Sequence, residues 1–140
     1  MEIKLKKVIN FGKMPIANAF LTPEKFEDEY FYNMILGYDP KTKAIGLVNK
    51  VPKEMMFHEN YAFFSSTSKG MQIHFRETAE KLLSYAGKGI VVEMGSNDGI
   101  MLEAWKNLGI RAIGIEPSKN VAEVSKSKGH EVITKFMSNE

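Results

Sequence analysis

The spacing of hydrophobic residues changes about halfway along the chain. From about Ser68 to Tyr85, apolar side chains recur at intervals of three and four residues, as on one face of an amphipathic helix. Gly87 follows and is expected to end the helix. The apolar positions on this face are Met71, Phe75, Ala79, Leu82, Leu83 and Ala86. We therefore expect an α-helix here, with Ser68 capping its first turn.

Short apolar runs and helical segments alternate along the rest of the chain. The runs at residues 89–94, 112–116 and 131–136 are short and apolar, as in strands that are buried in parallel sheets. Between them, residues 100–108 and 117–128 have helical spacing, and each of these segments is followed by a glycine. Parallel strands joined by helices form a right-handed, Rossmann-like α/β sheet.

Residues 1–66 have weaker patterns and are expected to form a small, irregular, β-containing lobe. Two apolar runs within residues 31–50 flank the letters DPKT at 39–42, which are turn residues, so this segment predicts a hairpin. A further short strand is expected over residues 4–12. The predicted organisation is this lobe followed by the N-terminal half of a Rossmann-like domain over residues 67–140.

Composition narrows the classes of function. Lysine and arginine number 19 against 17 acidic residues, so the chain lacks the basic excess with which proteins bind nucleic acid phosphates. No apolar run approaches the roughly 18 residues of a membrane span, and the first residues lack a signal-peptide core. Cysteine is absent, which excludes disulfides and thiolate metal ligands. We expect a cytoplasmic protein that binds neither nucleic acid nor membranes.

A glycine-containing loop follows the first strand of the predicted sheet. Its spacing is Glu93-x-Gly95-x-x-x-Gly99 with Asp98 inside, whereas dinucleotide-binding loops follow G-x-G-x-x-G and approach a diphosphate that carboxylates would repel. The acids suit S-adenosylmethionine, which carries a sulfonium, an ammonium and a ribose diol but no phosphate. Glu116, at the end of the next strand, is placed to accept hydrogen bonds from the ribose. The other interpretation is a tight strand-to-helix turn with solvated acids.

Four motifs occur in order along the chain: MPIANAFL, MMFHENYAFFSSTSKGMQIHF, VVEMGSNDGIML and GIEPSKNVA. In these motifs, from about Phe11 to Phe136, the chain resembles the sugar C-methyltransferases of deoxysugar biosynthesis. The resemblance implies a zinc-binding N-terminal lobe, a Rossmann-type domain that binds S-adenosylmethionine, and a further domain that helps to hold a nucleotide-linked keto sugar. The implied reaction transfers a methyl group to a sugar carbon beside a ketone.

The same resemblance suggests roles for individual residues. Residues 95–99 would surround the methionine end of the cofactor, and Glu116 would hold its ribose. The implied cofactor-binding residues are Glu93, Gly95, Ser96, Asn97, Asp98, Gly99, Glu116 and Pro117. Tyr61 would orient the ligand or stabilise a developing enolate, or else it only packs the lobe onto the sheet.

Residues near the start of the long helix are the implied substrate contacts. They are Ser65, Ser66, Ser68 and His74. Helix capping by the serines and an ordinary helix position for the histidine are the alternatives. The other two histidines, His58 and His130, are expected at the surface.

Two departures from the family change the expectations. The zinc-binding cysteines are absent, and the second pair would fall near Thr42 and Ile45, so we expect a lobe without zinc. The predicted sheet supplies only strands 3, 2 and 1 of the family's order 3-2-1-4-5-7-6, which leaves the first cofactor strand with an unpaired edge. We therefore expect the N-terminal part of an enzyme, incomplete for catalysis, that self-associates or pairs with a missing C-terminal half.

Three functions remain open from the sequence. The first is an S-adenosylmethionine-dependent methyltransferase that acts on a carbon of a nucleotide-linked keto sugar, with oxygen or nitrogen also open as acceptor atoms. The second is a catalytically inactive module that binds a nucleoside ligand or a partner chain. The third is an NAD-binding half-domain, which Asp98 and the missing middle glycine disfavour.

Overall fold

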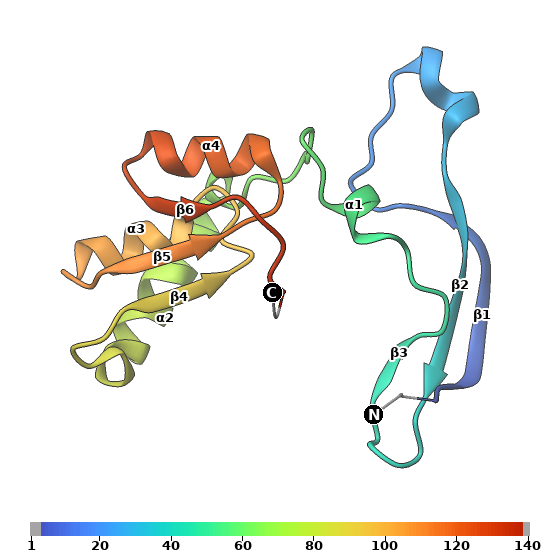
Figure 1. Cartoon of the computed structure of the whole chain (residues 1–140), viewed down its shortest axis with the longest axis horizontal. Coiled ribbons are helices and arrows are strands. Elements are labelled where there is room, and N and C mark those ends of the chain that lie inside the picture. Colours follow the sequence, from blue (N-terminus) through green and yellow to red (C-terminus); the bar gives the residue numbers. More distant parts are fainter. Residues whose placement is uncertain (1–3, 139–140) are drawn as a thin grey trace. The chain divides into compact units, whose positions relative to one another are not determined.

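The computed structural model describes residues 4–138 and divides after Met56 into two compact units (Figure 1). The first unit contains an antiparallel sheet and the second a parallel sheet with helices. The sequence places the boundary at residue 66. In the structure, residues 57–66 group with the second unit, because their backbone is hydrogen-bonded to its glycine-containing loop.

Strand pairing dominates the first unit. Its elements are β1 (Lys6–Pro15), the 3-10 helix η1 (Pro23–Asp28), β2 (Phe31–Tyr38), β3 (Ile45–Leu47) and the short helix α1 (Lys53–Met56). β1 pairs antiparallel with β2, with two register shifts, and β2 pairs antiparallel with β3. Among residues 4–56, Ile35 is the one hydrophobic side chain that is buried. Backbone pairing therefore holds this unit more than a hydrophobic core does.

The predicted hairpin turns around Asp39. Its carboxylate accepts hydrogen bonds from the Lys41 N–H at 2.9 Å and from the Thr42 hydroxyl at 2.8 Å, and these bonds lower the pKa of Asp39, the backbone bond most. These hydrogen bonds close the turn. Within the described residues, no three His, Asp or Glu side chains are gathered so that they could hold a metal ion.

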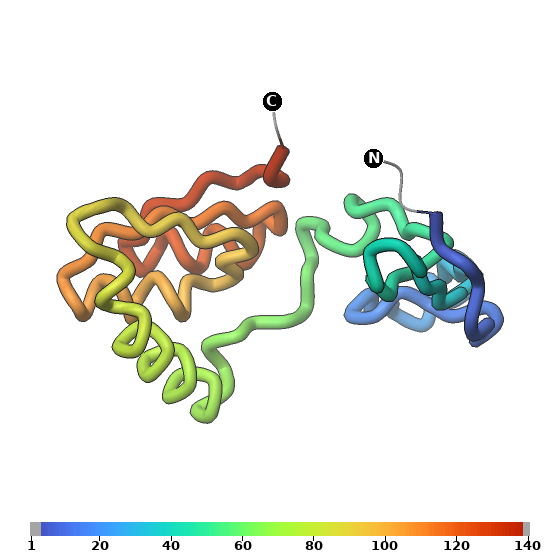
Figure 2. The backbone as a smooth tube through the Cα atoms, turned by 90° about the horizontal axis from the view of Figure 1, so that it is seen from below, coloured from blue at the N-terminus to red at the C-terminus, as the bar shows by residue number. Residues whose placement is uncertain are grey.

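The second unit alternates helices, visible as coils in the backbone tube of Figure 2, with parallel strands. Its elements are η2 (Ser65–Thr67), α2 (Lys69–Ala86), β4 (Val91–Met94), α3 (Ile100–Asn107), β5 (Ala112–Ile115), α4 (Lys119–Ser127) and β6 (Glu131–Ile133). The three strands are parallel and lie in the order β4-β5-β6. The mixed α/β fold with a parallel three-stranded sheet is therefore present, as the alternating pattern predicts.

Local signals set the limits of most of these elements. Ser68 caps α2 by accepting the Met71 N–H at 3.4 Å, and Gly87 follows the helix with a positive φ of 55°. β6 is shorter than the predicted 131–136. Its last paired residue is opposite Ile115, where β5 itself ends, so the residues beyond have no strand to pair with.

The helices of the second unit cover one face of its sheet. Ala79 of α2 packs with residues of α3, including Trp105, and Val91 and Ala112 of the sheet pack against this cluster. The alternate side chains of β4, among them Met94, are exposed. The described residues contain no helix that is long and apolar enough to cross a membrane.

Candidate functional site

The glycine loop, residues 95–99, joins the carboxyl end of β4 to the first turn of α3. Gly95, Asn97 and Gly99 have positive φ angles of 72°, 48° and 84°. Such angles favour glycine and are tolerated by asparagine, which explains these residue types. The space where a Cβ on Gly95 would lie is open, whereas a Cβ on Gly99 would come within 2.6 Å of His130. The loop thus combines an open side at Gly95 with a packed side at Gly99.

Glu116, directly after β5, binds the glycine loop. Its carboxylate accepts the Asn97 N–H at 2.9 Å and the Ser118 N–H at 2.7 Å, and the residue is only 4% exposed. Pro117, between Glu116 and Ser118 in the sequence, is half-buried. Each carboxylate oxygen has a second acceptor position, so these bonds leave capacity for hydroxyl donors of a ligand. Glu116 therefore organises the loop whether or not it also binds a ribose.

Glu93 lies on β4 opposite Gly114 of β5. Burial raises the pKa of its carboxyl to about 8, and the nearby negative charge of Glu116 adds to the effect. Glu93 is therefore protonated at neutral pH. A cationic group placed beside it would favour the ionised form, because an opposite charge lowers the pKa of an acid.

Buried side-chain polar atoms that make no hydrogen bond are concentrated around the ends of these strands. Among the described residues, such atoms are found on Glu93, Ser96, Ser118, Asn120, Ser125 and His130. The first four belong to β4, the glycine loop and the start of α4. Buried polar groups in proteins are normally hydrogen-bonded, so this concentration favours a place that receives a polar ligand. We call Glu93, residues 95–99 and residues 116–118 the strand-end site.

Tyr61 lies in the segment that leads to η2. Its ring packs against Phe57 with the ring centroids 5.7 Å apart, and its carbonyl accepts a hydrogen bond from the Asn120 side chain at 2.8 Å. The side chain is half-buried. The same segment is bound to the glycine loop farther along, which brings Tyr61 into the same unit as the strand-end site.

The four implied substrate residues lie in different settings. Ser65 is buried, Ser66 is half-buried, and both donate to side chains of the glycine loop. Ser68 caps α2, as predicted. His74 is exposed on α2, where its ring packs against Phe75. The structure therefore brings Ser65 and Ser66 to the loop and leaves Ser68 and His74 on α2.

His130 was expected at the surface, and this prediction is wrong. Its side chain is only 3% exposed, and burial lowers its pKa. Its Nε2 lies 3.3 Å from the carboxylate of Glu103. The ring fills the space beside Gly99, which has no side chain to occupy it. No periodic pattern marks this contact, because the two residues come from different elements.

Asn120 and Lys128 are further residues of the site region that sequence reasoning missed. Asn120 binds the Tyr61 carbonyl, and Lys128 binds the glycine loop at Asp98. Asn120 lies in the motif GIEPSKNVA, which was a signal for it, whereas Lys128 lies outside the four motifs.

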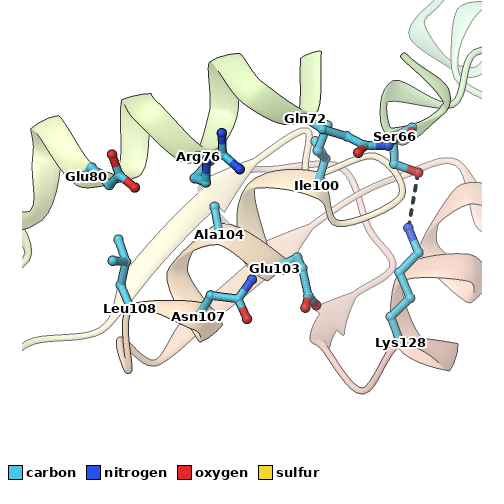
Figure 3. Close-up of a pocket in the computed structure, with 10 residues that line it drawn as sticks. All are labelled: Ser66, Gln72, Arg76, Glu80, Ile100, Glu103, Ala104, Asn107, Leu108 and Lys128. Carbon is cyan, nitrogen blue, oxygen red and sulfur yellow. Dashed lines mark hydrogen bonds between the residues drawn. The ribbon is translucent and has the colours of Figure 1, made fainter. Parts of the chain in front are cut away.

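A groove of about 580 Å³ lies between α2 and α3 (Figure 3). Its lining residues are Ser66, Gln72, Arg76, Glu80, Ile100, Glu103, Ala104, Asn107, Leu108 and Lys128. Lys128 and Ser66 lie together at one end, joined by a hydrogen bond of 3.3 Å (Figure 3). The lining includes neither Glu93 nor Glu116, so this groove is distinct from the strand-end site.

Comparison with known proteins gives a related sequence. No protein-family model matches the chain. The chain is 26% identical over 130 residues to the C-methyltransferase NovU of Streptomyces niveus, and the matched region is 90% of this chain and 31% of that protein. The chain spans about a third of the length of this curated relative. Along most of its own length it is therefore similar to a C-methyltransferase.

Proposed function

We propose that the strand-end site binds S-adenosylmethionine and that the chain forms part of a methyltransferase. The observations that carry this proposal are the acids and the buried polar atoms without hydrogen bonds at the strand ends, and the open space at Gly95. The carboxyl ends of parallel strands are the usual ligand-binding edge of such sheets. The similarity to a C-methyltransferase supports the same cofactor.

The residues present fit the groups of this cofactor. Glu93 has a buried carboxyl oxygen that makes no hydrogen bond. The positively charged methionine end of the cofactor, placed beside this carboxyl, would lower its raised pKa. Glu116 keeps acceptor positions for ribose hydroxyls. Gly95 leaves room for close approach to the backbone. Bound there, S-adenosylmethionine supplies an electrophilic methyl group.

We further propose a carbon of a nucleotide-linked keto sugar as the methyl acceptor in the complete protein. The sugar C-methyltransferase motifs and the similarity to a C-methyltransferase support a carbon acceptor. Tyr61 is the residue of this chain that we assign to the acceptor, because its segment is bound to the glycine loop. Its phenol would donate a hydrogen bond to the oxygen that gains charge when the carbon is deprotonated.

Titration calorimetry tests the cofactor. S-adenosylhomocysteine and S-adenosylmethionine should bind more tightly than NAD. Glu116→Gln should weaken their binding by roughly 1.5–3 kcal/mol, the range for a hydrogen bond to a charged group. Glu123→Gln is the matched control, because it removes the same charge from an exposed position on α4. Tighter binding of NAD than of both other ligands would refute the proposed cofactor.

A further inference from the structure

We propose that Asn97, Asp98 and Lys128 are positioning residues that hold the Tyr61 segment against the glycine loop. Together with the backbone of residues 63–66 they form what we call the polar latch. The proposal rests on the proposed function in one respect: the latch sets where Tyr61 lies relative to a ligand at the strand-end site. It assigns to Asn97 and Asp98 a role other than contact with the cofactor.

Asn97 binds the backbone on both sides of Phe64. Its side-chain nitrogen donates to the Phe63 carbonyl at 3.0 Å, and its side-chain oxygen accepts the Ser65 N–H at 2.9 Å. The amide therefore pairs with this segment as a neighbouring strand would. One N–H and one acceptor position of the side chain remain after these two bonds. The Asn97 N–H is itself bound to Glu116, so Asn97 links the polar latch to the rest of the strand-end site.

Asp98 forms the centre of the latch. Its carboxylate accepts the Ser66 N–H at 3.1 and 3.2 Å and also accepts the Ser66 hydroxyl. The residue is 1% exposed. A buried carboxylate is costly unless it is both hydrogen-bonded and paired with a cation. Here the hydrogen bonds come from a residue 32 positions earlier in the chain, which ties the two segments together.

Lys128 supplies the cation. Its ammonium lies 3.8 Å from the Asp98 carboxylate and donates to the Asp98 carbonyl at 2.8 Å and to the Ser66 hydroxyl at 3.3 Å. Figure 3 shows the Ser66 contact, with Lys128 reaching up from the end of α4. One side chain therefore joins α4, the glycine loop and the segment before α2.

Asn120 fixes the segment a few residues earlier, through its bond to the Tyr61 carbonyl. The backbone from Tyr61 to Ser66 is thus held at both ends by polar side chains of the Rossmann-like unit. Asp98 is paired with Lys128 and Glu93 is protonated, so the charge that disfavours a diphosphate at this site is that of Glu116.

Amide hydrogen exchange followed by NMR tests the latch. Lys128→Met should speed exchange of the Ser66 N–H at least tenfold and raise the Kd for S-adenosylhomocysteine at least fivefold. Lys128→Arg keeps the charge and should restore most of both properties. Lys126→Met is the matched control, because that lysine lies on the same helix and pairs with the exposed Glu123 instead. Ser66→Ala, which removes only the hydroxyl bonds, serves as a milder second variant if Lys128→Met does not fold.

The outcomes separate the latch from the proposed function. Unchanged exchange of the backbone N–H at position 66, in Lys128→Met and in Ser66→Ala alike, would overturn the polar latch. Faster exchange with an unchanged Kd would overturn the positioning role and leave a structural one. A ligand that restores slow exchange in the variants would support positioning, because binding would then reorder the segment. If the unsubstituted chain bound no S-adenosylhomocysteine, the proposed function and the positioning role would both fail, and the exchange rates would still decide whether the latch exists.

Discussion

The two units of the chain are stabilised in different ways. In residues 4–56 one hydrophobic side chain, Ile35, is buried, and the sheet is held by strand pairing and the hydrogen-bonded turn at Asp39. In the second unit, α2 and α3 bury a cluster against β4 and β5, with Trp105 only 3% exposed. Buried apolar area supplies most folding free energy, so the second unit should be the more stable one. The candidate site lies in this unit.

Each unit nevertheless has one glycine within a strand where neighbouring atoms leave no room for a Cβ. A Cβ on Gly37 would lie 2.8 Å from atoms of Leu5 and of Val48, and a Cβ on Gly114 would lie 2.8 Å from an atom of Leu102. Both glycines are therefore needed for packing rather than for an unusual backbone conformation. The two glycines differ in their neighbours, because a Cβ on Gly114 would also meet Ser96 of the glycine loop. Substitutions can therefore measure the difference between the units.

The largest effect is expected from Trp105→Ala. The change leaves a cavity in the main cluster and should destabilise the second unit by roughly 3–5 kcal/mol. Phe20→Ala is the control, because Phe20 is 81% exposed in the first unit and its loss should cost little. Urea unfolding followed by circular dichroism measures both. A loss below about 1 kcal/mol for Trp105→Ala would contradict the core described above.

The paired glycine substitutions are expected to have an intermediate effect. Gly114→Ala and Gly37→Ala should each destabilise their own unit by roughly 1–3 kcal/mol, because the added methyl group displaces packed neighbours. Only Gly114→Ala should also weaken binding of S-adenosylhomocysteine, since it pushes on Ser96. If calorimetry gave equal ligand affinities for the two variants, the packing of β5 would have no influence on binding at the strand-end site.

A smaller, pH-dependent effect is expected from Glu93→Gln. Below pH 4.5 the folded and unfolded chains both hold the Glu93 proton, whereas between 4.5 and about 8 the unfolded chain releases it and the folded chain keeps it. Stability of the unsubstituted chain should therefore fall across this window. Relative to the unsubstituted chain, Glu93→Gln should gain up to about 3 kcal/mol of stability as the pH rises from 5 to 8. A constant difference between Glu93→Gln and the unsubstituted chain across this pH range would contradict the protonated state of Glu93.

The smallest effect on stability is expected from Met94→Lys. Met94 is 68% exposed on the face of the parallel sheet that the helices do not cover, so the change should alter stability by less than about 0.5 kcal/mol. If that face associates with another chain, light scattering should show less association for the variant. Ile45→Lys is the control, because Ile45 is 69% exposed in the first unit. Identical scattering from both variants and the unsubstituted chain would argue against association through this face of the sheet.

Local patterns along the sequence determined most of the elements. The spacing of apolar residues with Ser68 and Gly87 predicts α2 almost residue by residue, and the turn residues at 39–42 predict the hairpin. The glycine loop was also predicted, because its spacing follows an apolar run and precedes a helical one. These features depend on neighbours within a few residues, which is the range over which backbone geometry and capping act.

Tertiary structure alone decided the partners of the polar side chains. Asp98 was predicted to face a ligand, but the fold places it against Ser66 and Lys128, 32 and 30 positions away. His130 is buried because Gly99, far from it in sequence, leaves room for its ring. Whether a charged or polar side chain binds a ligand or its own protein depends on which segments the fold brings together. The spacing of residues along the chain does not contain that information, because a hydrogen bond requires proximity in space.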